Sequence, residues 1–250
     1  MLAQATGERL VSMAEALSHD DCHYALQPDE RMGFLFPVHG WRPPRLVREF
    51  VGKLTIDGAE GHFCYVLATA GDDIGETMDI FGRDLMAAIG ISPQSRYSLL
   101  MPNTYVGLPF MDVDDEELAQ LKKSKAAHRM ATITGEIVER QTGIESINPS
   151  RWPRINSRLL GKAFTRWLIT DERFRVDDTR CRQCGLCRQV CPVGNISGGK
   201  GEHPQWLHTG RCLTCFACYH HCPAHAIDWG RETRGKGQYH YCDKEELKET

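Results

Sequence analysis

The sequence has no long hydrophobic run and no strong surplus of charge of either sign. No apolar stretch reaches the roughly 18 residues that suggest a membrane-spanning helix. Residues 1–17 lack the charged segment followed by an apolar stretch that marks a secretory signal peptide. The formal net charge of -3 gives no reason to expect binding to nucleic acid. We therefore expect a cytoplasmic protein that neither inserts into a membrane nor binds nucleic acid.

Cysteine is the residue type that stands out. The 250 residues include 11 cysteines, and eight of them lie between Cys181 and Cys222. In a cytosolic protein, clustered cysteines indicate metal or redox chemistry more often than disulfides. Cys64 lies in an apolar stretch, so we predict that it belongs to the core. We assign no role to Cys22 or Cys242.

The eight clustered cysteines form one motif twice, at an offset of 31 residues. The two copies are Cys181, Cys184, Cys187 and Cys191 before Pro192, and Cys212, Cys215, Cys218 and Cys222 before Pro223. This is the spacing of bacterial ferredoxins, in which the fourth cysteine binds the other cluster. Three cysteines at short intervals present three thiolates to one cubane, whereas the fourth lies past a turn. We therefore predict two [4Fe-4S] clusters, cluster 1 on Cys181, Cys184, Cys187 and Cys222, and cluster 2 on Cys212, Cys215, Cys218 and Cys191.

Structural zinc is the alternative for these cysteines. Zinc sites usually pair two Cys-x-x-Cys knuckles and use four ligands for one ion, which fits two consecutive triplets poorly. The segment has few large apolar side chains, so we expect it to need its metal in order to fold. We also expect His220 and His221, just before Cys222, to be exposed polar residues.

The first two-thirds of the chain alternate short apolar runs with helical patterns. Such alternation indicates a parallel sheet covered on both faces. The predicted strands are 9–13, 32–38, 62–70 and 97–101, and the predicted helices are 45–54, 79–89, which Gly90 closes, and 112–140. Within a connector at 144–170, residues 157–168 form an amphipathic basic helix. Such a helix suits either a membrane surface or packing between two domains with its basic face exposed, and we favour the second interpretation.

Taken together, these features resemble a family in which a short flavodoxin-like domain is fused to a bacterial-type ferredoxin with two [4Fe-4S] clusters. The matching segments are 36–38 with His39 and Trp41, 70–72, 101–103, 191–196 and 233–240. The resemblance implies an α/β flavodoxin-like domain with strand order 2-1-3-4-5, followed by a small α+β ferredoxin-like domain. It also implies FMN beside His39, Trp41, Gly71 and Asp72, and electron transfer between the flavin and the clusters.

The sequence departs from that family at its start, because no apolar strand and no Ser/Thr-Gly phosphate loop are present. We therefore expect an incomplete doubly wound parallel sheet with unpaired strand edges. The predicted parts are the flavodoxin-like domain 1–143, the connector 144–170, the ferredoxin domain 171–230 and a polar tail 231–250. We expect an electron carrier rather than an enzyme with its own substrate. Two forms remain open, a relay linked to FMN, or a flavin-free ferredoxin module whose α/β domain docks a partner redox protein.

Overall fold

The computed structural model describes residues 2–241, which form two compact units. Within these residues, unit 1 comprises 2–102 and 117–168, and unit 2 comprises 103–116 and 169–241. The division differs from the expected one in two ways. Segment 103–116 belongs to unit 2 and not to the α/β part. Most of the expected connector, residues 144–168, belongs to unit 1. Cys242 lies outside the described residues.

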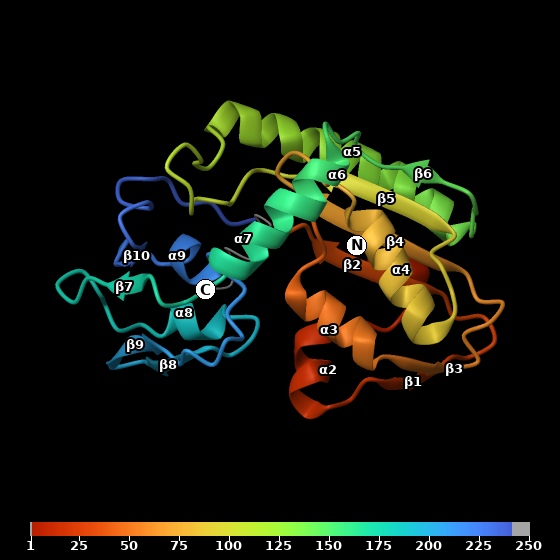
Figure 1. Ribbon diagram of the computed structural model, residues 1–250, viewed down its shortest axis with the longest axis horizontal. Helices are drawn as coiled ribbons and strands as arrows, with labels where there is room; N and C mark the ends of the chain where they lie inside the picture. The colour runs from red at the N-terminus through yellow and green to blue at the C-terminus, as the bar shows by residue number, and fades with distance from the viewer. Residues whose placement is uncertain (1, 242–250) are drawn as a thin grey trace. The chain divides into compact units, whose positions relative to one another are not determined.

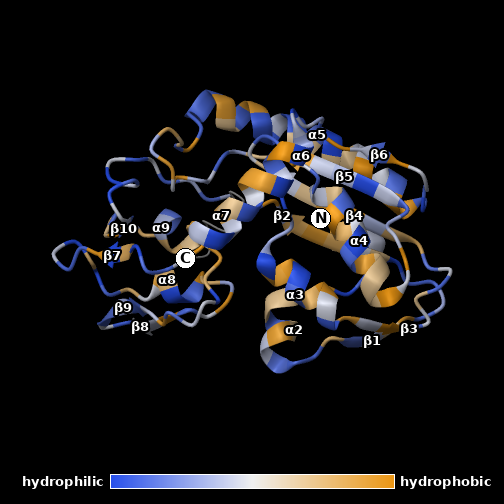
Figure 2. Cartoon of the chain, viewed as in Figure 1, coloured by the Kyte–Doolittle hydropathy of each residue, from blue (hydrophilic) through white to orange (hydrophobic). Residues whose placement is uncertain are grey.

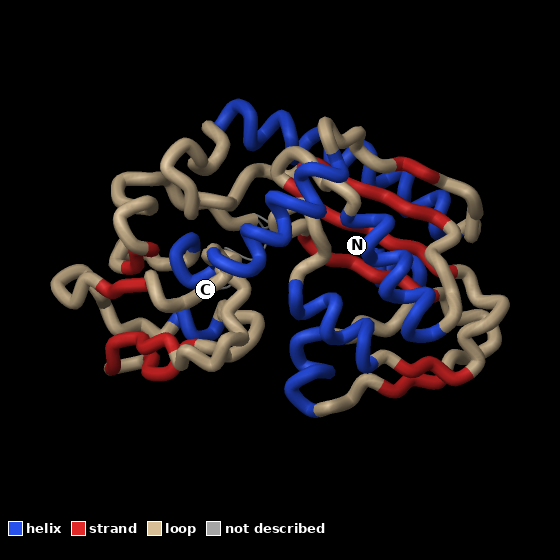
Figure 3. The backbone as a smooth tube through the Cα atoms, in the orientation of Figure 1, coloured by secondary structure: helices blue, strands red, loops and turns tan. Residues whose placement is uncertain are grey.

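Unit 1 alternates helices and strands (Figures 1 and 3). Its elements are α1 (Leu2–Thr6), α2 (Met13–His19), β1 (His23–Ala25), β2 (Met32–Pro37), α3 (Arg45–Lys53), β3 (Thr55–Asp57), β4 (Cys64–Ala70), α4 (Thr77–Ile89), β5 (Ser95–Leu100), α5 (Glu116–Val138), β6 (Glu145–Ser146), α6 (Pro153–Ile155), the π-helix η1 (Asn156–Leu160) and α7 (Gly161–Trp167). None of the described helices combines the length and the hydropathy needed to cross a membrane.

The core of unit 1 is a parallel sheet with strand order β2-β4-β5-β6. Side chains alternate along β4 because successive residues of a strand face opposite sides. Cys64 and Val66 pack with residues of α3 and α4, whereas Tyr65 and Leu67 pack with residues of α5. The sheet is therefore covered on both faces, as the alternating pattern predicted (Figure 1).

Strand β2 lies at the edge of this sheet. It pairs with β4 along one side, and within residues 2–241 no strand pairs with its other side. Its residue Leu35 is 45% exposed. Strands β1 and β3 pair with each other in a separate sheet of two strands. Strand β2 is thus an open edge of this sheet, within the part of the chain that the structure describes.

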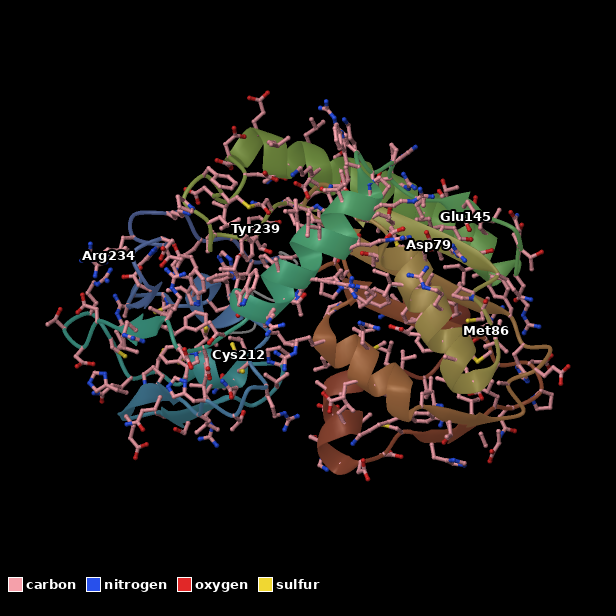
Figure 4. The ribbon with its side chains drawn as sticks, viewed as in Figure 1. Asp79, Met86, Glu145, Cys212, Arg234 and Tyr239 are labelled. Atoms are coloured by element: carbon pink, nitrogen blue, oxygen red, sulfur yellow. The ribbon has the colours of Figure 1, made fainter. Side chains whose placement is uncertain are left out.

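Most predicted elements form within a few residues of their expected bounds. Gly90 ends α4 in the left-handed region with φ 74° and donates to the carbonyl of Met86, which satisfies a free acceptor of the last turn. Arg96 on β5 pairs with Asp79 of α4, which ties the sheet to a covering helix, and with Glu145 of the neighbouring strand β6 (Figure 4). The strand predicted at 9–13 is wrong, because Ser12 accepts a hydrogen bond from Glu15 and caps the start of α2.

Unit 2 repeats one small pattern. Its elements are β7 (Phe174–Val176), α8 (Leu186–Gln189), β8 (Ile196–Gly199), β9 (Glu202–Trp206), α9 (Ala217–His220) and β10 (Ile227–Trp229). Two antiparallel pairs form, β7 with β10 and β8 with β9. Helices α8 and α9 start 31 residues apart, as do β8 and β10, so the repeat in the cysteine motif extends to the backbone.

The C-terminal tail and segment 103–112 are joined inside unit 2. The ammonium of Lys236 donates to the backbone carbonyls of Val106 at 2.9 Å, of Met111 at 2.6 Å and of Leu108. The backbone N–H of Gly237 donates to the Asp112 carboxylate at 3.0 Å. The polar tail is therefore a structural part of unit 2, with its lysine enclosed by carbonyl groups.

Candidate metal centres

The first cysteine motif lines a cavity together with one cysteine from the second. The sulfur-bearing residues around it are Cys181, Cys184, Cys187 and Cys222. They are joined there by Leu186, Pro204 and Ile227, which make much of the remaining wall apolar. Cys187 is buried within α8, and Cys184 is exposed, the only one of the eight motif cysteines that is. The structure thus brings together the four residues that the sequence assigns to cluster 1.

The second cavity has the complementary set. It is lined by Cys212, Cys215, Cys218 and Cys191, so its fourth cysteine comes from the first motif. Phe174, Trp206 and Phe216 enclose it, and the rings of Phe174 and Trp206 are stacked with centroids 5.1 Å apart. Figure 4 labels Cys212 among the side chains of unit 2. The residues assigned to cluster 2 therefore lie in a largely apolar surrounding.

The two motifs share three backbone positions in the left-handed region. In the first motif these are Gln183 (φ 51°), Gly185 (φ 79°) and Gly194 (φ 59°). Their counterparts 31 residues later are Thr214 (φ 48°), Phe216 (φ 58°) and His225 (φ 49°). A β-branched residue is strained in this region, and Thr214 is held there by hydrogen bonds of its hydroxyl with the backbone of Thr170. The cysteine loops thus have the same turns, although only the first motif uses glycine for them.

Backbone N–H groups donate to the cysteine sulfurs at matching places. Asn195 donates to Cys191 at 3.3 Å and Ala226 donates to Cys222 at 3.3 Å, in each case from four residues further along the chain. Hydrogen bonds of this kind stabilise negative charge on the sulfur and are one of the means by which a protein tunes the potential of an iron–sulfur cluster. The two remote cysteines therefore have equivalent surroundings.

Burial controls the charge of the thiols when no iron is bound. It raises the pKa of Cys187 and of Cys212 to about 11, and it raises the pKa of Cys218 well above its usual value. These thiols are neutral at neutral pH in the metal-free chain. Because a metal ligand must be a thiolate, cluster binding at these residues releases protons.

The two histidines near Cys222 differ from the expectation. His220 is buried, and its pKa falls to about 4, chiefly because burial disfavours the charged ring. Its Nδ1 accepts from the backbone N–H of Tyr239 at 3.2 Å, so its Nε2 donates to the carbonyl of Thr104 at 2.7 Å. The ring of His221 is half-buried and stacks on that of His240. His220 is therefore a structural bridge and not an exposed polar residue.

The loops expected to hold FMN both start at the carboxyl end of the parallel sheet in unit 1. The loop with His39 and Trp41 follows β2, and the loop with Gly71 and Asp72 follows the neighbouring parallel strand β4. Burial lowers the pKa of His39 to about 4. The carbonyl of Gly71 accepts from Lys122 at 2.9 Å, and the carboxylate of Asp72 accepts from the backbone of the next residue.

The helical segment formed by η1 and α7 packs against these loops. The Ser157 hydroxyl donates to the carbonyl of Trp41 at 2.7 Å and accepts from the N–H of Glu76 at 2.7 Å. A Cβ added to Gly75 would lie 2.3 Å from that hydroxyl, and a Cβ added to Gly161 would lie 2.4 Å from the carbonyl of Gly40. Helix and loops are thus in contact where the flavin was expected. These contacts do not fit an FMN bound against Trp41.

The cysteine sets, by contrast, fit iron–sulfur clusters. Each cavity offers four thiol groups, backbone donors to a sulfur and mostly apolar walls. Among residues 2–241, no three His, Cys, Asp or Glu side chains converge tightly enough to hold a single metal ion. A bound [4Fe-4S] cluster would supply one-electron redox chemistry at these cysteines.

Comparison with known proteins gave one match. A family model described as a 4Fe-4S dicluster domain matches residues 173–223, which include all eight cysteines of the two motifs. Neither the curated proteins nor the solved structures gave a match. Residues 173–223 are therefore a ferredoxin-like iron–sulfur module, and at least one [4Fe-4S] cluster is expected of such a module.

Proposed function

We propose that this protein carries single electrons through two [4Fe-4S] clusters. The observation that supports the proposal most strongly is the crossed arrangement of the cysteines around two cavities. Cys187 lines one cavity and Cys191 the other, although only three residues lie between them. Their Cα atoms can therefore lie at most about 14 Å apart. Two clusters whose ligands lie this close along one chain suit transfer of one electron from the first to the second.

The exposure of the ligands suggests where electrons enter or leave. Cys184 of the first set is exposed, whereas the members of the second set are half-buried or buried. We propose that redox partner proteins exchange electrons with cluster 1 on the side of Cys184. Cluster 2, enclosed by aromatic rings, is then the internal member of the pair.

The role of unit 1 in this proposal does not require a flavin. Ser157 and Gly161 contact the loops at the carboxyl end of its sheet. These contacts favour the flavin-free form of the carrier. We propose that unit 1 serves to dock the iron–sulfur unit onto its redox partner. Reconstitution with FMN, followed by gel filtration, tests whether the carrier is flavin-free. A stoichiometric FMN complex would contradict the flavin-free form.

The crossed assignment of ligands can be tested with serine variants. Each cluster should have its own EPR signal after reduction, and a serine ligand should alter the signal of its own cluster. We expect C222S to alter the same signal as C184S, and C191S to alter the same signal as C215S. If C222S instead alters the signal that C215S alters, the ligands are not crossed and the proposed pairing is wrong.

A further inference from the structure

The helical stretch 153–167 of unit 1 and its N-cap residue Trp152 expose large apolar side chains. Trp152, Leu159 and Trp167 have exposed fractions of 61%, 66% and 69%, and Ile155 and Leu160 are exposed by 45% and 46%. We call these five residues the apolar stripe. Residues spaced by three or four along a helix share a side, so 152, 155 and 159 adjoin one another. Adjoining exposed apolar side chains of this size mark an interaction site. Figure 2 shows hydrophobic bands among hydrophilic ones along this stretch.

A row of cations accompanies the apolar stripe. Arg154, Arg158, Lys162 and Arg166 follow one another at four-residue intervals, and all four are exposed. The sequence has no Asp or Glu between positions 147 and 170. Within residues 2–241, Arg158 is the member of this row that pairs with a carboxylate, that of Glu76 at 2.7 Å. The other three cations therefore remain available to an external anion.

The side of the helix opposite the apolar stripe holds it to unit 1. Ser157 and Gly161 are buried, and Ser157 bonds to the loops after β2 and β4. The backbone carbonyl of Ser157 also accepts from Arg42 at 2.8 Å. The helix is thus fixed in place, with its apolar stripe exposed and with Arg158 as the cation that also contacts unit 1. The basic face is exposed, as expected, and the exposed apolar stripe beside it was not foreseen.

We propose that this helix docks the protein onto an anionic lipid surface. A helix that lies in a membrane interface combines Trp and Leu on one face with Lys and Arg beside them. Tryptophan at each end of the stripe suits the interface, because its ring is apolar and its N–H can bond to headgroups. The cations would be drawn to anionic headgroups. An acidic protein could also match the cations, and the vesicle test separates it from a lipid surface. This inference does not rest on the proposed electron transfer.

Flotation of the full chain, with its clusters loaded, tests the proposal directly. We expect the protein to float with vesicles of phosphatidylglycerol and phosphatidylcholine and to stay behind with pure phosphatidylcholine. Raising the salt from about 0.1 M to about 1 M shortens the screening length about threefold and should weaken binding strongly. Brominated lipids should quench tryptophan fluorescence, because Trp152 and Trp167 are the exposed members of that residue type.

Variants separate the stripe from general surface effects. L159E should abolish flotation, whereas L121E, at a position on α5 that is 48% exposed, should float as the wild type does. The double variant R154Q/R166Q should lower the partition coefficient roughly 30-fold. All three change exposed side chains, and thermal unfolding checks that they fold.

Three results would overturn the proposal. They are a wild type that does not float at low salt, a wild type that floats equally with pure phosphatidylcholine, and an L121E as impaired as L159E. A dimer of the wild type that L159E converts to a monomer, without vesicle binding, would assign the stripe to a second copy of the chain.

Discussion

Replacing Lys236 by methionine removes the cation that joins the tail to segment 103–112. The half-buried ammonium donates to three backbone carbonyls, and the side chain of methionine offers no donor to replace it. A hydrogen bond to a charged group contributes about 1.5–3 kcal/mol, and water can reach part of this site. We therefore expect K236M to lower the free energy of unfolding by about 3 kcal/mol in total.

For a domain of roughly 60–100 residues, each kcal/mol lowers Tm by about 4–8 °C. The Tm of K236M should thus be roughly 12–24 °C lower than that of the wild type. The assay is anaerobic thermal unfolding, followed by visible absorbance and circular dichroism. R234M is the matched control, because Arg234 lies in the same tail, is exposed, and within residues 2–241 makes no hydrogen bond or ion pair (Figure 4). Equal Tm values for the two variants would refute the structural role of the lysine.

Two more predictions concern unit 1. Alanine normally stabilises a helix relative to glycine by about 1 kcal/mol, and G135A on α5 should do so because no atom lies within 4 Å of its Cβ. G161A should instead destabilise by about 1–3 kcal/mol, since its Cβ would press on the carbonyl of Gly40; urea unfolding measures both, and a stabilising G161A would show that the helix does not pack on that loop. Burial raises the pKa of Cys64 from 9.0 to about 12, so the folded state keeps this thiol neutral where the unfolded state ionises. The free energy of unfolding therefore falls as pH rises above 9. Between pH 8 and pH 10 the wild type should lose about 1.4 kcal/mol more stability than C64A, and parallel pH profiles of the two proteins would contradict the burial of an un-ionised thiol.

Local patterns in the sequence were sufficient for much of this structure. The cysteine spacing repeats at 31 residues, and the backbone repeats with it, because each ligand loop is specified by residues within a dozen positions. The strand at 64–70 was predictable for the same reason, since a continuous apolar run fits a strand buried on both faces. Cys64 was correctly placed in the core.

Features that depend on distant partners could not be predicted. Nothing near Thr104 indicates that its carbonyl bonds to His220, 116 residues later, so neither the place of segment 103–116 in unit 2 nor the burial of His220 was foreseen. The helix at 157–168 was predicted as amphipathic, but its period could not show which side faces the sheet. Ser157 and Gly161 are buried there because they are small enough to meet the loops after β2 and β4.

The most direct test of the central claim is the cofactor content of the protein purified without oxygen. Iron, acid-labile sulfide, zinc and FMN should be quantified on the same sample, with visible spectra before and after dithionite. We predict about eight irons and about eight sulfides per chain, as two [4Fe-4S] clusters require, with negligible zinc and FMN. Zinc in place of iron and sulfide would contradict the proposed electron carrier, and one FMN per chain would contradict its flavin-free form.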